Sequence, residues 1–270
     1  MRTRLLVALV LTACTALAGC GSDKEPSIMD KDTLVAGVRP DLPGLGLRRA
    51  DGQFEGLDVD VARYVAGRLG KRVRFEPALA ADRERLLLDG KVDLVLTFWV
   101  EPEWKVRLAF AGPYYLSYQD ILIRSGESGI RGVHDLKGRK LCDVAGSGAA
   151  DQVTRERQVA AVRVPVANYA QCVAKLQNGQ IDAITTNDTI LAGLKRQNPA
   201  AAFTLLNVRF GERRTGIGMR PDDPDGCEAV NKAVTQMYQD GTMRRLMHKW
   251  FDGTGLDLSD IAVPQFEGCL

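Results

Sequence analysis

The sequence predicts an α/β protein whose parallel sheets are arranged in two lobes. Short apolar β-type runs alternate along the chain with segments of helical periodicity, as where 33–38 is followed by 58–69. Repeated strand–helix units of this kind form parallel sheets with helices on both faces. Segments 87–95 and 176–184 share one order of features, in which a helix end and a glycine precede an Asp between apolar residues. This similarity predicts two lobes built on one plan.

The individual elements follow from local patterns. The segment 58–69 has an acidic start and apolar side chains at 57, 61, 65 and 69, which form the stripe of a helix. Pro and Gly in 40–46 predict a loop, and Asp51 followed by Gly52 predicts a turn. The same reasoning gives strands at 33–38, 73–76, 92–97, 140–144, 162–164 and 181–185, and helices at 58–69, 81–88, from 149 onward and at 169–177.

Composition excludes several classes of protein. The chain has 270 residues, of which 45% are hydrophobic and 26% charged, so it is neither collagen-like, largely disordered nor a multi-span membrane protein. Two of the 36 basic residues lie in the first nineteen positions, which leaves 34 basic and 34 acidic residues beyond them. A neutral chain without a basic block argues against a nucleic-acid partner. With 2 His and no CxxC spacing we expect no metal site and no cofactor.

The N-terminus predicts an export signal. Arg2 and Arg4 precede the apolar run 5–18, which has the length of a signal-peptide core and is short for a hydrocarbon layer of ~30 Å. The run ends in Leu-Ala-Gly before Cys20, which resembles a bacterial lipobox and implies lipidation of Cys20. An ordinary secretory signal with an incidental Cys is the alternative. We expect an extracytoplasmic protein, lipid-anchored to the cell membrane, with a signal peptide at 1–19 and a polar tether at 20–31.

The cysteines agree with an oxidising compartment. Cys14 lies in the predicted signal peptide and Cys20 carries the predicted lipid. An even number of remaining cysteines predicts two disulfides, and four cysteines allow three pairings. The four are Cys142, Cys172, Cys227 and Cys269.

Several motifs in order resemble the family 3 extracellular solute-binding proteins, the polar amino-acid receptors of ABC importers. The run Gly-Leu-Asp-Val-Asp-Val at 56–61 resembles the family signature, and Gly-Pro-Tyr-Tyr at 112–115 resembles the entry to its hinge strand. The remaining matching segments are 179–183 and 186–188, which resemble the second lobe, and 43–47, Cys172 and 191–193, which resemble the glutamate-type lipoprotein branch.

The resemblance implies a type II periplasmic-binding-protein fold, in which two hinge strands join two α/β lobes. One lobe would comprise 32–117 and 216–270, and the other 118–215. This division implies the pairings Cys142–Cys172 and Cys227–Cys269, because a disulfide across the lobes would lock the hinge. It also implies delivery of a glutamate- or glutamine-like amino acid to an ABC permease and its ATPase.

Candidate ligand-binding residues follow two buried strands. Asp188 comes after a strand, at the sheet edge where parallel sheets bind ligands, and the resemblance makes it the partner of the ligand ammonium. A helix N-cap is the alternative function of Asp188. Gly146, Ser147 and Gly148 lie between a strand and a helix, which predicts either an anion-binding turn or a tight turn without ligand. A nucleophilic Ser147 is not expected, since no G-x-S-x-G motif surrounds it.

Further candidates lie on the first loop and near the hinge. Arg39 and Asp41 follow the first strand, and the resemblance suits Arg39 to an acidic ligand side chain. A solvated surface charge is the alternative for Arg39. We expect Asp58 to cap its helix and to support the loop near the hinge, behind the ligand site. Gln119, just past the hinge entry, is a further ligand candidate.

Three positions depart from the family pattern. The family usually carries a Thr and, five residues on, an Arg that grips the ligand carboxylate in a bidentate pair. Here these positions are Trp99 and Trp104, and Pro40 stands where the first loop usually has an aromatic residue. A shift in register would bring Lys105 or Arg107 to the carboxylate, although Lys is a poor substitute for a bidentate Arg.

Several functions therefore remain open. The first is an amino-acid receptor with a rebuilt carboxylate clamp. The second is a receptor for another solute, in which Trp99 and Trp104, beside Glu101 and Glu103, cage a cationic group. The third is a sensor or scaffold that binds no amino acid, with both Trp packed on the lobe surface. An enzyme is not expected, because Glu101 and Glu103 have no evident catalytic partner.

Overall fold

The computed structural model describes residues 26–259, 261 and 263–269. The predicted signal peptide, Cys20 and the first part of the predicted tether lie outside the described residues. Among the helices that the structure describes, none has both the length and the apolar character needed to cross a membrane.

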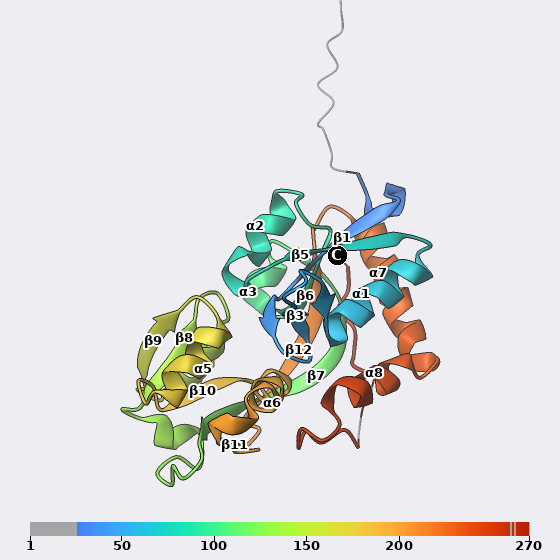
Figure 1. The fold of residues 1–270 in the computed structure, drawn as a ribbon. Coiled ribbons are helices and arrows are strands. Elements are labelled where there is room, and N and C mark those ends of the chain that lie inside the picture. Colours follow the sequence, from blue (N-terminus) through green and yellow to red (C-terminus); the bar gives the residue numbers. More distant parts are fainter. Residues whose placement is uncertain (1–25, 260, 262, 270) are drawn as a thin grey trace, which may run out of the picture.

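Two bodies of α/β structure are joined by two long strands (Figure 1). The strands are β7 (Ala109–Arg124) and β12 (Gly211–Met219), which pair antiparallel along almost their whole length. Because both strands run from one body into the other, the two predicted sheets form one continuous sheet in the order β5-β1-β6-β12-β7-β10-β8-β9, with β11 also paired to β7. The predicted lobe boundaries at 117/118 and 215/216 fall inside β7 and β12.

The first lobe contains the parallel strands β5, β1 and β6. Helix α1 covers them with a face that includes the buried residues Leu57, Val61 and Val65, as the apolar stripe predicts. A three-stranded sheet, β2-β3-β4, completes this lobe. The elements are β1 (Thr33–Val38), β2 (Asp41–Leu42), β3 (Gly46–Arg48), β4 (Phe54–Glu55), α1 (Leu57–Arg68), β5 (Arg72–Pro77), α2 (Arg83–Leu88), β6 (Leu94–Trp99), α3 (Pro102–Lys105), α7 (Pro224–Gln239) and α8 (Thr242–Phe251).

The second lobe contains the parallel strands β10, β8 and β9, with β10 antiparallel to β7. The helix expected from 149 is a single turn that continues as the π-helical turn Gln152–Glu156. The other predicted elements lie within a few residues of their expected bounds. The elements are β8 (Lys140–Val144), α4 (Ala149–Asp151), β9 (Val162–Val166), α5 (Tyr169–Gln177), β10 (Ala183–Asn187), α6 (Asp188–Gln197) and β11 (Phe203–Leu205).

Both predicted disulfide pairings are confirmed. Cys142 on β8 bonds Cys172 on α5, and Cys227 on α7 bonds Cys269 near the C-terminus. The second bond returns the C-terminal tail to the hinge strands, where Glu267 N donates to Gly112 O at 2.7 Å. The Glu267 carboxylate also pairs with Lys105 and with Arg214 on β12, both at 2.5 Å. The tail therefore ties α3, β7 and β12 together.

Replacing Cys227 and Cys269 together by Ala is expected to lower the free energy of unfolding by ~3 kcal/mol, because the unfolded chain loses a constraint. Chemical denaturation followed by circular dichroism measures this change. Reducing the wild-type protein should cost more, since both disulfides are then lost. An unchanged denaturation midpoint in the double variant would contradict the expectation.

Candidate ligand-binding cleft

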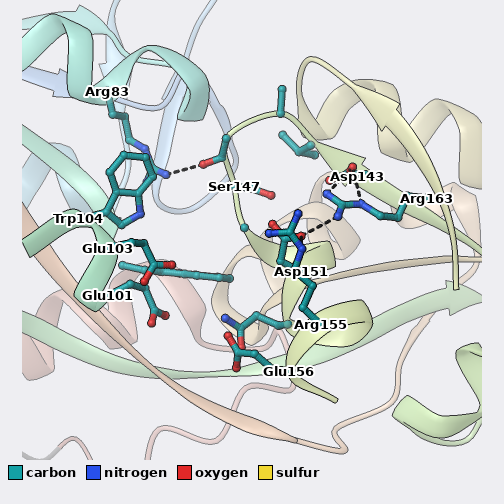
Figure 2. A pocket seen from close by; sticks show the side chains of 16 residues that line it. Arg83, Glu101, Glu103, Trp104, Asp143, Ser147, Asp151, Arg155, Glu156 and Arg163 are labelled. Carbon is teal, nitrogen blue, oxygen red and sulfur yellow. Dashed lines mark hydrogen bonds and ion pairs between the residues drawn. The ribbon is translucent and has the colours of Figure 1, made fainter. Parts of the chain in front are cut away.

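A cleft of about 380 Å³ separates the two lobes (Figure 2). We call it the outer chamber. The first lobe contributes Trp99, Glu101, Glu103 and Trp104, and the second lobe contributes the β8–α4 turn and the π-helical turn that follows. The predicted turn residues Gly146, Ser147 and Gly148 all line it.

An inner chamber of only about 10 Å³ lies deeper in the cleft. It shares Arg83, Trp99 and Ser147 with the outer chamber, so these three residues stand where the chambers meet. The rest of its wall is polar except for one Ile. It consists of Arg39, Thr97, Tyr169, Thr186 and Ile190.

Arg83 is the buried cation at this junction. Its Nη1 donates to Thr97 O at 2.6 Å, and its Nη2 donates across the cleft to Gly146 O at 3.0 Å. The guanidinium also lies 4.0 Å from the ring centroid of Phe98. No carboxylate of the described residues forms an ion pair with Arg83. Burial lowers its pKa to about 9, and the nearby charge of Arg39 adds to this effect.

Arg39 is a second charged residue of the inner chamber, and Asp41 pairs with it from outside the chamber wall. Arg39 is 3% exposed, which excludes the surface-charge alternative. Its Nε and Nη2 each donate to Asp41 at 2.9 Å, in a bidentate pair. Asp41 also accepts from Tyr169 N at 3.1 Å, and Tyr169 Oη donates to Thr186 Oγ1 at 2.7 Å. The first loop is thereby connected to α5 and β10 of the second lobe.

Asp58 supports this site from behind. Its carboxylate is fully buried and accepts from Thr97 Oγ1 and, at 2.6 Å, from Tyr114 Oη. It does not cap α1, which begins after Gly56. Burial raises the pKa of Asp58 to about 6, while the hydrogen bonds from Thr97 and Tyr114 oppose that rise. Asp58 thus positions Thr97, whose carbonyl in turn positions Arg83.

Thr97 is held in an unusual conformation. Its φ of 51° is uncommon for a β-branched residue and costs on the order of 1–3 kcal/mol. Its N–H donates to Tyr114 Oη at 3.0 Å, in addition to its bonds with Asp58 and Arg83. Backbone strain of this kind is typical of binding sites, where surrounding contacts hold it in place.

Glycines allow the lobes to approach. Gly146 has φ of 70°, and a Cβ there would lie 2.6 Å from Ala81 Cα in the first lobe. Gly193 lies on α6, and a Cβ there would overlap the carbonyl oxygen of Pro43. Both contacts join opposite lobes, so small residues at 146 and 193 are needed for this closed arrangement.

Asp188 does not lie with the residues of either chamber. It lines a separate cavity of about 340 Å³ together with Tyr118 and Arg209. Its Oδ1 accepts from Tyr118 N at 3.3 Å and from Thr189 N at 2.8 Å, and its Oδ2 lies 3.6 Å from Arg209 Nε. It is the first residue of α6 rather than its N-cap, which is Asn187. Burial raises the pKa of Asp188 to about 6.

Lys105 and Arg107 are the alternative candidates for binding the ligand carboxylate, but both pair with acidic residues outside the chambers. Lys105 pairs with Glu267, and Arg107 pairs with Glu84 at 2.6 Å. Gln119 is buried in the second lobe, where its Nε2 donates to Ala149 O at 2.8 Å. None of these three residues lines either chamber. Trp99 and Trp104 both line the outer chamber.

No sequence pattern distinguishes Arg83 or Tyr169 as site residues. Arg83 stands in the run Asp-Arg-Glu-Arg, which resembles the solvated face of a short helix. Tyr169 opens a helix with no motif around it. Both reach the cleft only through the packing of the two lobes.

Comparisons with known proteins agree with this architecture. Residues 34–253 match the model of the bacterial extracellular solute-binding proteins, family 3. The chain belongs to this family. It is 33% identical to the glutamate-binding protein GluB of Corynebacterium glutamicum over 255 residues. This alignment covers 90% of this chain and 85% of the relative. It is 29% identical to the ABC transporter glutamine-binding protein GlnH of Bacillus subtilis, over 91% of this chain and 95% of the relative.

Solved structures show the same type II fold. An ancestral arginine-binding protein bound to arginine matches with a TM-score of 0.75 and 28% identity, over 82% of this chain and 99% of that one. An ancestral amino-acid-binding protein, AncCDT-1, described as a precursor of cyclohexadienyl dehydratase, matches with a TM-score of 0.75 and 28% identity, over 83% and 98% of the two chains. The predicted family and fold are confirmed.

Gly193→Ala is expected to destabilise the protein by ~2 kcal/mol, because the added methyl group overlaps Pro43. Gly67→Ala on α1 is the matched control, since nothing lies within 4 Å of a Cβ there. A helical Gly→Ala without steric conflict should stabilise by ~0.5–1 kcal/mol. Urea denaturation distinguishes the two signs. Stabilisation by both substitutions would mean that Pro43 and α6 are not in contact in solution.

Asp188→Asn is expected to alter the pH dependence of stability. A carboxyl group whose pKa is raised in the native state binds its proton more tightly in the folded than in the unfolded chain. The protonated group therefore contributes to the free energy of unfolding at low pH, and this contribution is lost as pH rises from about 4 to above 6. Asn keeps the acceptor for both backbone N–H groups and does not titrate. The stability of the variant minus that of the wild type should therefore rise by up to ~3 kcal/mol between pH 4 and pH 7. Denaturation across this range measures it, and a difference independent of pH would refute the assignment.

Proposed function

We propose that the protein is an extracytoplasmic receptor for a polar amino acid of the glutamate or glutamine type, which it delivers to an ABC importer. The observation that carries the proposal is Arg83, a buried guanidinium that donates to backbone carbonyls and has no carboxylate partner among the described residues. A ligand carboxylate would supply the missing countercharge in a charge-assisted hydrogen bond. The glutamate- and glutamine-binding relatives support this class of ligand.

The charge distribution of the inner chamber favours an anion. Burying a guanidinium without an opposite charge is costly, and Arg39 adds a second positive group to the same wall. Asp41 neutralises Arg39 but not Arg83. A carboxylate at the junction would have Arg83 on one side and the Ser147 hydroxyl nearby, since both residues line both chambers.

The dimensions of the cleft determine where such a ligand lies. The inner chamber is too small for an amino acid, whereas the outer chamber falls in the usual size range of small-molecule sites. The ligand would therefore occupy the outer chamber and extend one carboxylate to the junction. Entry requires the lobes to separate along β7 and β12, in a hinge motion about the proposed boundaries at 117/118 and 215/216.

Transport and anchoring complete the proposal. Lipidation of Cys20 would hold the receptor at the outer face of the cell membrane through the tether 20–31. A permease and an ATPase of the importer would be its partners, and it would release its ligand chemically unchanged. Binding without turnover agrees with the relatives, which are named as binding proteins.

Arg83→Gln is expected to weaken binding of L-glutamate by roughly 10–100-fold, because one charged hydrogen-bonding partner of the carboxylate is lost. Isothermal titration calorimetry on the purified full-length protein measures the affinity. Arg85→Gln is the matched control on the same helix, since Arg85 pairs only with exposed acids. Thermal melts of both variants show whether the fold is retained.

Two results would contradict the proposed function. Unchanged glutamate affinity in folded Arg83→Gln protein would remove Arg83 from the ligand site. Failure of the folded wild-type protein to bind glutamate, aspartate or glutamine would favour the two alternatives, a receptor for another solute or a sensor or scaffold without an amino-acid ligand.

A further inference from the structure

The outer chamber carries more acidic than basic charge once its ion pairs are counted. Asp143 and Asp151 are both paired with Arg163, at 2.8 Å and 2.6 Å. The other three carboxylates of the chamber come from both lobes, two from the first and one from the π-helical turn of the second. They are Glu101, Glu103 and Glu156.

Two of these carboxylates share one cation, and the third has none among the described residues. Arg213 on β12 lies 3.5 Å from Glu101 and 3.7 Å from Glu156, both longer than a charge-assisted hydrogen bond. Within the part of the chain that the structure describes, Glu103 has no ion pair. Burial raises the pKa of Glu101, and Glu103 and Glu156 add to that rise while Arg213 opposes it. A cation placed between the glutamates would relieve this repulsion.

The tryptophans form walls rather than a cage. Arg213 already lies 5.1 Å from the ring centroid of Trp99, and Arg107 lies 5.2 Å from that of Trp104. Trp104 also packs edge-on against Phe98 at 5.3 Å. Because each ring already has a cation beside it, recognition of a cationic ligand group falls to the carboxylates.

Gln152 provides an independent indication of a ligand donor. It lines the outer chamber and is 6% exposed, yet its Oε1 has no hydrogen-bond partner among the described residues. A buried amide oxygen without a donor costs free energy, and such groups are normally satisfied. The Oε1 atom is itself buried, so a turn of this side chain toward the chamber would let a ligand ammonium group donate to the amide as well as to the carboxylates.

We propose that the outer chamber binds the ammonium group of the ligand through Glu101 and Glu103, with Gln152 as a further acceptor, while Arg83 binds a carboxylate at the junction. This inference rests on the proposed function and assigns the opposite end of the same ligand. It moves ammonium recognition away from Asp188, which lies in a separate cavity and is already bonded to two backbone N–H groups. In Figure 2 both glutamates lie on the wall that faces Asp151 and Glu156, with Trp104 between them and Arg83.

The test compares L-glutamate with glutarate, which has the same two carboxylates and no ammonium group. Isothermal titration calorimetry on the full-length protein in detergent gives both affinities. The wild-type protein should bind glutamate more tightly than glutarate. In Glu101→Gln and in Glu103→Gln this preference should fall by roughly tenfold or more, while glutarate affinity stays the same or rises. Glu103→Gln is the safer variant for folding because Glu103 is exposed and has no ion pair within the described chain.

Two controls locate the ammonium group. Glu84→Gln removes a carboxylate that pairs with Arg107 and does not line the chamber, so the preference should be unchanged. Asp188→Asn should also leave the preference unchanged. Loss of the preference in Asp188→Asn, with retention in both glutamate variants, would overturn the inference and place the ammonium group at Asp188.

The remaining outcomes separate this inference from the proposed function. A wild-type protein that binds glutamate and loses that binding in Arg83→Gln, but keeps the full preference in both glutamate variants, supports the proposed function and overturns the inference. A wild-type protein that binds neither compound overturns both.

Discussion

The buried guanidinium of Arg83 is the interaction on which the cleft depends. It connects the strained Thr97 carbonyl of the first lobe to the Gly146 carbonyl of the second, so a single side chain spans the gap between them. Asp58 and Tyr114 hold Thr97 in place from the core. A cation in this position can bond carbonyl oxygens, but only an anion can neutralise it. In the proposed function, a ligand carboxylate at the junction would supply that charge.

Closure also depends on close backbone contacts between the lobes. At Gly146 and Gly193 the chains approach so closely that a methyl group would collide with the opposite lobe. The long strands β7 and β12 connect the lobes through continuous hydrogen bonding, and the C-terminal tail is tied across both strands by Glu267 and by the bond between Cys227 and Cys269. The proposed hinge motion would therefore take place along these two strands, which the C-terminal tail braces.

The carboxylates considered for binding the ligand ammonium group lie in two different cavities and have different hydrogen-bonding partners. Asp188 faces the cavity beside the C-terminal tail, where backbone N–H groups already satisfy it. Glu101 and Glu103 face the cleft, where Arg213 pairs with Glu101 and is shared with Glu156. Since Trp104 stands where the family usually has an Arg, ligand recognition would rest on Arg83 at one end and on these glutamates at the other.

The sequence by itself determined the fold class and the family, because periodicity and ordered motifs are local properties. It left three cysteine pairings open, and the lobe division implied by the family resemblance selected the two pairs that the structure contains. Of the residues that the sequence singled out, Arg39 and the turn 146–148 do line the cleft, and Asp41 pairs with Arg39 without lining either chamber. Only the tertiary structure decided that Arg83 and Tyr169 join them, that Asp188 faces another cavity, and that Lys105 and Arg107 face other acids. There are two physical reasons. Neighbouring residues of a strand or helix point to different faces, so an error of one residue in an expected position turns the side chain away from the cleft. The ion-pair partner of a charged residue in a polar run is fixed only when elements distant in the sequence pack together.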